Sequence, residues 1–344
     1  MIVPVYILFF TLSFISLSVK LKNKNEIIFT LFIIYFSCII IAVFRSSDTL
    51  DYQIYYEAFK YNKLERAEIG YQITMTLIRK ISDSFKSLLF IMAATSIGIK
   101  LIAIRYFSNN ILLSLIVYIS NILLLHDMIQ MRAAIASGLI LFAIFYSKNR
   151  QLFKFLLCII IGTLFHQSML AIAPIWFLRS NNIKYKLWIL LIPIGYCLAI
   201  TNNTIGHLVS YIPIPIIQNS YHQYQLAMDA GMFSAINIFN TVLILRVIIC
   251  ITILIKIKDI QTQNKQAILW IKLYSLGIFS LLVFSDIQVI AVRLSELFFV
   301  IEIVLFPLLI YIFPRKSQNI GKLSVISISL LMLLVNTFYI HLLV

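Results

Sequence analysis

Long apolar stretches follow one another along the whole chain, separated by short polar segments. A helix needs about 20 mainly apolar residues to cross the hydrocarbon core of a bilayer, and many of these stretches approach or reach that length. We therefore predict an all-α, polytopic transmembrane helical bundle of about 10–12 spans. The candidate spans are 2–19, 27–44, 86–105, 110–126, 129–147, 187–201, 235–256, 266–284, 287–313 and 322–342.

The stretch 155–178 allows two interpretations. The basic loops before and after it, 148–154 and 179–186, both look cytoplasmic, yet only one apolar run separates them. Either 155–178 is a single span and one of the two basic loops lies outside despite its charge, or 155–178 is a re-entrant hairpin that breaks near His166. Each half of that hairpin would have about 11 residues, or roughly 16 Å, enough to reach the middle of the bilayer. We prefer the hairpin.

The distribution of charge orients the spans. Short loops rich in lysine and arginine are expected in the cytoplasm, whereas the charges of 45–86 nearly balance and 201–234 contains Asp229 but no lysine or arginine. We therefore expect one integral membrane domain over residues 1–344, with outer loops near 45–85 and 201–234. The inner loops are marked by Lys20, Lys22, Lys24, Lys148, Arg150, Lys154, Arg179, Lys184, Lys186, Lys256, Lys258, Lys265, Arg315, Lys316 and Lys322.

The composition agrees with a membrane protein. Of 344 residues, 61% are hydrophobic and 12% charged, and the mean hydropathy is +0.98, far from a soluble domain, which is about 45–50% apolar and 25% charged. The net charge of +15 sits in loops that face anionic lipid, so we expect no nucleic-acid partner. All four cysteines lie in apolar runs and no metal or nucleotide motif is present, so we expect no metal and no cofactor.

Ionisable and other polar side chains gather at the predicted outer ends of the spans. Such groups are costly inside a membrane and are functional candidates by default. Their convergence indicates a cavity that opens to the outer face. The side chains are Arg45, His126, Asp127, Gln130, Arg132, Asp286, Arg293 and Glu296.

The outer segment after the second span resembles an amphipathic helix at the membrane surface. Asp48, Tyr52, Tyr55 and Phe59 recur at helical spacing, Asp51 joins that face, and Ser47 or Asp48 can cap the helix start. One interpretation is an interfacial anchor with a belt of tyrosines. The other is a carbohydrate cleft, in which tyrosine rings stack on sugars and the carboxylates hold or deprotonate hydroxyls.

Three further side chains also allow two interpretations each. Arg132, beside a run of small residues, either snorkels to the interface or clamps a phosphate with its guanidinium fork. Arg293 either forms an intrahelical ion pair with Glu296 or plays a similar binding role. His166, deep in an apolar run, is either a structural residue or part of the site.

These residues together resemble a known family, the Wzy-type polysaccharide polymerases and in particular the EpsG-like family. The likeness runs from the second span to about Arg293, and the order and spacing of its blocks carry it. The blocks are Phe44-Arg45 through Asp48-Thr49-Leu50-Asp51-Tyr52 with Tyr55, then Glu68-Ile69-Gly70-Tyr71, then Met131-Arg132-Ala133-Ala134-Ile135-Ala136, then Phe165-His166-Gln167-Ser168, and Arg293.

The resemblance implies a GT-C-like, multi-pass enzyme of the bacterial cytoplasmic membrane. Such enzymes join oligosaccharide repeat units carried on undecaprenyl pyrophosphate at the outer face, without a nucleotide sugar. Membrane lipids, and a chain-length regulator and a flippase of the same pathway, would be partners. The residues implied to bind substrate are Arg45, Tyr52, Tyr55, Glu68, Arg132 and Arg293, and those implied in catalysis are Asp48, Asp51 and His166.

Other membrane classes remain as alternatives. A lipid-linked glycan flippase or other transporter would show internal repeats and interrupted helices at the midplane, and no repeat is visible. An O-antigen-ligase-like glycosyltransferase uses the same donor, and the sequence barely separates it from a polymerase. A membrane acyltransferase would have an early intramembrane histidine, and none precedes His126.

Overall fold

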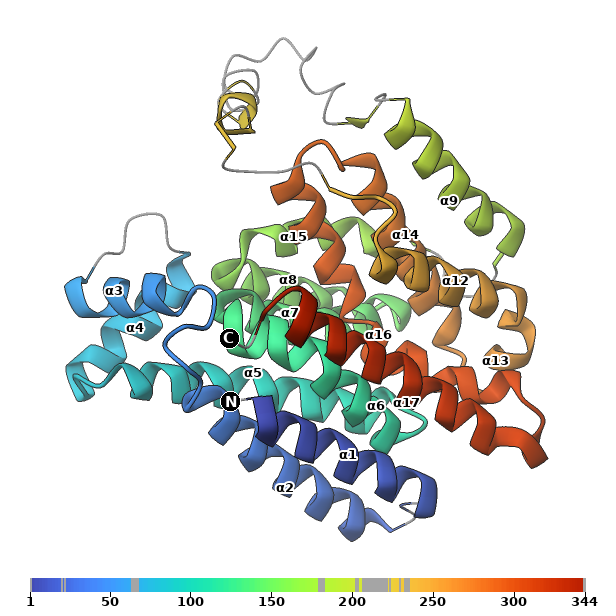
Figure 1. The fold of residues 1–344 in the computed structure, drawn as a ribbon, viewed down its shortest axis with the longest axis horizontal. Helices are drawn as coiled ribbons and strands as arrows, with labels where there is room; N and C mark the ends of the chain where they lie inside the picture. The colour runs from blue at the N-terminus through green and yellow to red at the C-terminus, as the bar shows by residue number, and fades with distance from the viewer. Residues whose placement is uncertain are drawn as a thin grey trace. The chain divides into compact units, whose positions relative to one another are not determined.

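The described part of the chain is helical. The computed structural model describes residues 2–19, 21, 23–62, 68–178, 183–201, 204–205, 222, 224–228, 230–231 and 236–342, and within these ranges it contains no strand (Figure 1). The all-α prediction is therefore confirmed. Most of the predicted outer loop 201–234 lies outside the described residues, as do 63–67 of the other outer loop and Lys20, Lys22 and Arg179 of the inner loops.

The chain divides into two compact units. The first comprises Met1–Leu178 and Glu302–Val344, and the second Arg179–Ile301. The helices of the first unit are α1 (Ile2–Ser18), α2 (Lys24–Val43), α3 (Tyr52–Tyr61), α4 (Ile69–Ile81), α5 (Phe85–Phe107), α6 (Ile111–Val117), the π-helix η1 (Tyr118–Ile129), α7 (Met131–Lys148), α8 (Leu152–Phe165), the 3-10 helix η2 (Gln167–Phe177), α16 (Glu302–Leu305), the 3-10 helices η3 (Phe306–Ile312) and η4 (Arg315–Ser317), α17 (Gln318–Leu334) and the π-helix η5 (Val335–Tyr339).

The second unit is built around one central helix. Its helices are α9 (Tyr185–Ile200), α12 (Thr241–Ile255), α13 (Ile257–Gln263), α14 (Ala267–Val283) and α15 (Gln288–Phe299). α14 packs against α9, α12 and α15. Close packing is possible because Gly277 of α14 faces Phe298 and Phe299 of α15, where an added Cβ would come within 2.8 Å of Phe298.

The helices include segments that can cross a membrane. Within the described residues, five are long and apolar enough: Lys24–Val43, Phe85–Phe107, Ile111–Ile129, Met131–Lys148 and Arg315–Tyr339. Six shorter apolar helices accompany them: Ile2–Ser18, Leu152–Phe165, Gln167–Phe177, Tyr185–Ile200, Thr241–Ile255 and Ala267–Val283. The chain is thus a multi-pass membrane protein.

The predicted break near His166 is confirmed. α8 ends at Phe165, His166 is extended with φ −154° and ψ 110°, and η2 packs back against α8. At the far end of η2, Arg150 at the α7–α8 turn donates to the carbonyl of Trp176. The chain therefore returns to the level at which α8 begins, as a hairpin does.

One predicted span is wrong. The stretch 287–313 is not a continuous helix but consists of α15, a turn at Val300–Ile301, the single turn α16 and the 3-10 helix η3. Pro307 lies at the start of η3. A proline has no backbone N–H and its ring clashes with the carbonyl four residues earlier, which accounts for the change from α16 to η3. The turn at Val300–Ile301 lies before the reach of this proline.

The centre of the first unit is the helix formed by α6 and η1. Within Ile111–Ile129, 89% of an 18-residue apolar stretch is buried. The helices that contact one or both of its parts are α1, α2, α5, α7, α16 and α17. A helix that is surrounded on all sides presents every side chain to another helix. Polar side chains on η1 must therefore find partners on its neighbours.

Candidate functional site

A close approach between α4 and α8 brings Glu68 near His166. Gly70 lies against the carbonyl of Leu164, where an added Cβ would come within 2.8 Å of the oxygen. Any larger residue would push the two helices apart. Glu68 precedes the first residue of α4 and His166 follows the last residue of α8, so the contact between the helices places the two side chains together. Nδ1 of His166 lies 3.7 Å from Oε1 of Glu68.

Arg132 binds the other oxygen of the same carboxylate. It is the second residue of α7, and its Nη1 donates to Oε2 of Glu68 at 2.5 Å. Nε donates to the hydroxyl of Tyr55 at 3.4 Å, and the guanidinium carbon lies 5.8 Å from the centre of that ring. One carboxylate thus joins two potentially cationic side chains from helices that are distant in sequence. We call Tyr55, Glu68, Arg132 and His166 the rim cluster.

Electrostatics keep Glu68 ionised. Burial alone would raise its pKa, but the interactions with His166 and Arg132 outweigh burial and lower the pKa of Glu68 to about 2. The phenol of Tyr55 has a raised pKa because it is buried, despite the charge of Arg132. Around neutral pH the rim cluster therefore holds a carboxylate, a guanidinium and a neutral phenol.

Arg45 lies beside the rim cluster with most of its guanidinium unpaired. It follows α2, its Nη1 donates to the carbonyl of Asp127 at 3.4 Å, and its guanidinium carbon lies 5.7 Å from the centre of the Tyr52 ring. It is only 6% exposed, yet its Nε and Nη2 have no hydrogen-bond partner among the described residues. The buried hydroxyl of Tyr71 and both ring nitrogens of His126 also have no hydrogen-bond partner among the described residues. Buried polar groups are normally satisfied, so this side of the site has unused capacity to bind a polar ligand.

A second ionic group lies deeper and is fully paired. Nζ of Lys100 donates to Oδ1 of Asp127 at 2.7 Å and to the carbonyl of Ala134 at 2.8 Å. The same carboxylate accepts from Ser96 at 2.6 Å and from Tyr118 at 2.8 Å. Both charged side chains are 0% exposed. We call Lys100, Asp127, Ser96 and Tyr118 the core network.

The π-helix makes the core network possible. Tyr118 and Asp127 are nine residues apart, or about two and a half turns of an α-helix, which would point them in opposite directions. The wider π-helix, with its i→i+5 hydrogen bonds, brings them to the same side of η1. π-helical turns are frequent at functional sites, and this one also carries His126, which lies within electrostatic range of both His166 and Lys100.

The predicted site residues of the outer loop are arranged differently from the prediction. α3 begins only at Tyr52, so Asp48 and Asp51 precede the helix instead of lying on one of its faces, and neither caps it with a side-chain hydrogen bond. The reason is Asp51, whose φ of 62° is left-handed and cannot continue a right-handed helix. Asp48 is exposed and accepts from Ser46 at 3.0 Å, whereas Asp51 acts electrostatically on Arg45 and Tyr55.

The remaining predicted face of α3 is confirmed. Tyr55 and Phe59 are buried. Phe85 at the start of α5 contacts Tyr52 and Phe59, with ring centres 5.2 and 5.8 Å away. Aromatic packing of this kind fixes a short helix that has little stability of its own, and it holds Tyr52 and Tyr55 next to the two arginines.

The remaining candidates lie elsewhere, and two polar residues at or near the two clusters were not foreseen. Arg293 is exposed on α15 in the second unit. Asp127 belongs to the core network and not to an outer cavity. Lys100 was missed, although a lysine inside an apolar span is itself a signal. Tyr71 was noted only as part of a motif, and no pattern in the sequence shows that its hydroxyl is buried without a partner.

The arrangement suits a polyanionic ligand more than a metal. No group of three or more histidine, cysteine, aspartate or glutamate side chains that could hold a metal ion occurs among the described residues. Two guanidinium groups offer donors to phosphate oxygens, and a histidine beside a carboxylate can accept a proton. The site can therefore bind an anionic group and remove a proton near it.

Comparison with known proteins assigns the chain to a family. No curated protein and no solved structure matches it. A family model matches residues 27–343, which include the rim cluster, the core network and Arg45. This family is associated with polysaccharide biosynthesis in membranes. The match covers nearly all of the chain, and the protein therefore belongs to the EpsG family.

Proposed function

We propose that this protein is a membrane polysaccharide polymerase that joins oligosaccharide repeat units carried on undecaprenyl pyrophosphate at the outer face of the bacterial cytoplasmic membrane. The observation that carries the proposal is the convergence of Arg45, Glu68, Arg132 and His166 at one place in a multi-pass membrane protein of the EpsG family. The near balance of charge in the segment that contains α3 supports an outward-facing site.

The reaction requires a pyrophosphate to leave. The bond between the anomeric carbon of the growing glycan and its pyrophosphate breaks, and a bond from that carbon to a hydroxyl of the incoming lipid-linked unit forms. Negative charge builds up on the departing pyrophosphate. Arg132, whose side chain is 31% exposed, and the unpaired Nε and Nη2 of Arg45 supply fixed positive charge without any proton transfer.

The acceptor hydroxyl loses a proton in the same reaction. His166 is the best placed of the three candidate bases, because Glu68 lies beside its Nδ1. A carboxylate at Nδ1 favours the tautomer with the proton there, which leaves Nε2 as the acceptor. Asp51 is the second candidate because it lies within electrostatic range of Arg45 and Tyr55. Asp48 is the weakest, since Ser46 binds its exposed carboxylate.

The surface glycan of a deletion strain tests the proposal. A strain without a polymerase displays single repeat units, a strain without a ligase attaches none, and a strain without a flippase exports none. We expect single units, with long chains restored by the wild-type gene and not by Arg132→Ala at equal membrane abundance. Loss of all surface attachment or of export would contradict the proposal.

The orientation has a separate test. A cysteine introduced at Asn62, the residue that follows α3, should react with an impermeant thiol reagent in intact cells, after outer-membrane permeabilisation if there is one. The four native cysteines all lie in apolar runs. The unmodified chain is the control, because it shows how much of the labelling comes from these four cysteines. Reaction only in inverted vesicles would place the rim cluster in the cytoplasm and contradict the proposal.

A further inference from the structure

Buried polar atoms without a hydrogen-bond partner gather beside the rim cluster. Among the described residues there are nine such atoms, and five of them belong to Arg45, Tyr71 and His126. They are Nε and Nη2 of Arg45, the hydroxyl of Tyr71 and both ring nitrogens of His126. These three residues are 6%, 2% and 0% exposed, respectively, so bulk water does not reach them. We call Arg45, Tyr71 and His126 the donor cluster.

The contacts of Arg45 place the three residues together within the first unit. Nη1 of Arg45 donates to the carbonyl of Asp127 at 3.4 Å, and Asp127 directly follows His126 in η1. Tyr71 of α4 lies within electrostatic range of the same guanidinium. The end of α2, the start of α4 and the π-helix therefore bring their polar side chains to one region.

The donor cluster adjoins the rim cluster on two sides. The ring of Tyr71 lies 5.7 Å from the ring of Tyr55, and His126 lies within electrostatic range of His166. Tyr55 and His166 both belong to the rim cluster, where the side chain of Arg132 is 31% exposed. A ligand that reaches Arg132 from outside therefore meets the donor cluster next.

The chemistry of the donor cluster suits an anion. Nε and Nη2 of Arg45 can only donate hydrogen bonds, and the phenol of Tyr71 and the imidazole of His126 can each donate one. Burial lowers the pKa of Arg45 to about 10, so its guanidinium is still charged at neutral pH. Buried charges are normally paired, whereas the hydrogen bond from Nη1 of Arg45 goes to a backbone carbonyl. A neutral sugar could accept hydrogen bonds here but would leave the charge uncompensated.

We propose that the donor cluster binds a phosphate group of the lipid-linked diphosphate, with Tyr71 and His126 as further substrate-binding residues. The inference rests on the proposed function, which supplies the diphosphate, and adds these two residues to it. Phosphate oxygens accept hydrogen bonds and bring the negative charge that compensates a guanidinium. Because the five atoms have no partner in the ligand-free protein, they need not give up an internal hydrogen bond when the phosphate binds.

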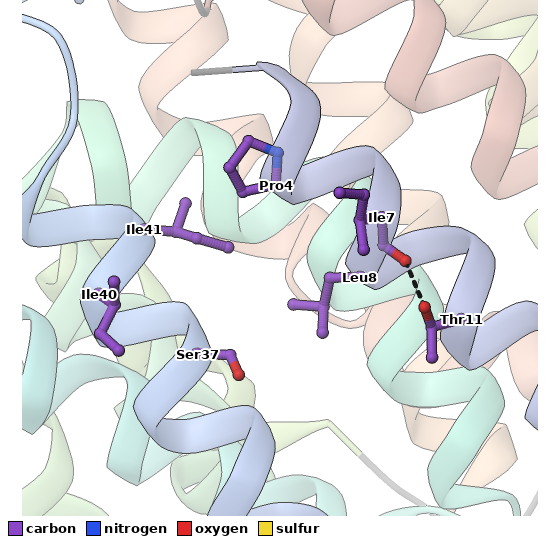
Figure 2. Close-up of a pocket in the computed structure, with 7 residues that line it drawn as sticks. All are labelled: Pro4, Ile7, Leu8, Thr11, Ser37, Ile40 and Ile41. Carbon is purple, nitrogen blue, oxygen red and sulfur yellow. Dashed lines mark hydrogen bonds between the residues drawn. The ribbon is translucent and has the colours of Figure 1, made fainter.

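The apolar groove between α1 and α2 differs from the donor cluster (Figure 2). The hydroxyl of Thr11 in its wall donates to the carbonyl of Ile7 at 2.7 Å, and no charged side chain lines the groove. Such a groove can hold hydrocarbon but does not recognise an anion, so the test must separate the head of a lipid from its chain. The lining residues are Pro4, Ile7, Leu8, Thr11, Ser37, Ile40 and Ile41.

Titration with a short polyprenyl diphosphate makes this separation. Farnesyl diphosphate is added to the full-length protein in nanodiscs, and its binding is measured by calorimetry. We expect binding that inorganic pyrophosphate displaces and farnesol does not, because the donor cluster recognises the head. Absence of binding, or binding that farnesol displaces at least as well as pyrophosphate, would overturn the proposal.

Variants of the donor cluster test the two new residues. Tyr71→Phe and His126→Leu remove polar atoms and keep most of the side-chain volume. Each should weaken binding about tenfold or more, as the loss of a hydrogen bond to a charged group does. The control Tyr35→Phe removes a hydroxyl that already donates to the carbonyl of Ala94 at 3.2 Å, and it should leave binding unchanged. Wild-type affinity in both cluster variants, or an equal loss in Tyr35→Phe, would refute the assignment.

The stability of the ligand-free variants provides a second readout. Tyr71→Phe removes a buried hydroxyl without a partner and should leave the unfolding temperature unchanged or raise it. Tyr118→Phe removes a buried hydroxyl that donates to Asp127 at 2.8 Å and should lower it. If Tyr71→Phe lowers the unfolding temperature as much as Tyr118→Phe, the hydroxyl of Tyr71 has a structural partner such as an ordered water, and the proposal is wrong.

The two proposals fail in different ways. Farnesyl diphosphate carries no saccharide, so its binding does not depend on glycosyl transfer. Wild-type binding by Tyr71→Phe and His126→Leu would refute the donor cluster alone, even if the deletion strain displays single repeat units. Weakened binding by both variants, in a protein whose deletion strain stops export or attachment, would refute the polymerase function alone.

Discussion

The rim cluster and the core network both pair a cation with a carboxylate, but only one of them can exchange partners. In the core network the charged side chains of Lys100 and Asp127 are 0% exposed, and the carboxylate receives three side-chain donors. In the rim cluster Arg132 is 31% exposed, and Glu68 is shared between Arg132 and His166. A buried ion pair whose hydrogen bonds are all made within the protein has a structural role. A partly exposed pair next to unpaired donors can exchange one partner for a ligand.

Burial explains the difference in expected roles. Removing one partner of a buried ion pair leaves an uncompensated charge in a medium of low polarity, which is strongly destabilising. Removing one partner of a partly exposed pair lets water solvate the other. The core network is therefore expected to determine whether the protein folds, and the rim cluster to determine what it does.

The largest effect should come from breaking the core network. Lys100→Met removes the cation and leaves the Asp127 carboxylate buried, which is expected to destabilise the protein by about 3–5 kcal/mol. Membrane abundance and thermal unfolding in detergent measure the effect. The double variant Lys100→Met/Asp127→Asn removes both charges and should recover most of the loss. Wild-type abundance of the single variant would show that the pair contributes little to folding.

The next largest effect should come from the base in the rim cluster. His166→Ala is expected to slow chain extension by about 10²–10⁴-fold, as the loss of a general base does, without a change in abundance. Asp51→Asn and Asp48→Asn serve as comparison variants, with a smaller loss expected for Asp51→Asn and little for Asp48→Asn. Glycan ladders at matched expression provide the measurement. Wild-type chain lengths in all three variants would remove every candidate base.

A somewhat smaller loss is expected from the arginine of the rim cluster. Arg132→Ala should reduce the rate by about 10²–10³-fold, comparable with the loss of one donor to a developing negative charge. Arg132→Lys should also fail, because an ammonium cannot reproduce the geometry of the guanidinium fork. Both variants should reach wild-type abundance. If both extend chains normally, Arg132 only anchors the end of α7 at the interface.

The smallest effect concerns the pH dependence of stability. The pKa of Glu68 is lowered to about 2 from 4.5, so its ionised form stabilises the fold above about pH 4.5 and this contribution is lost as the pH falls toward 2. The difference in unfolding temperature between wild type and Glu68→Gln should thus be constant from pH 8 to about 5 and shrink below that. A difference that stays unchanged down to about pH 2 would mean that folding does not lower the pKa of Glu68.

The sequence by itself determined the membrane architecture and most of the candidate residues. Apolar stretches of about 20 residues have few alternatives to membrane helices, so the spans could be predicted with the exception of 287–313, which is interrupted. The break at His166 was predictable because two basic loops cannot both be cytoplasmic if a single span lies between them. Arg132 and His166 could be chosen as candidates because charged or polar residues within apolar runs are costly, and Glu68 through the resemblance to the EpsG-like family.

Only the tertiary structure decided how these residues are combined. Arg132 and Glu68 are 64 residues apart, and their pairing depends on α4 and α7 both packing against α8, where Gly70 allows the close contact between α4 and α8. The left-handed backbone of Asp51 separated the two outer aspartates from the face of α3, and the turn at Val300–Ile301 interrupted a helix that hydropathy alone would continue. The core network required a π-helix, which differs from an α-helix by one residue in each hydrogen-bonded turn. Packing chooses between such forms, and a local pattern of apolar residues carries too little information to do so.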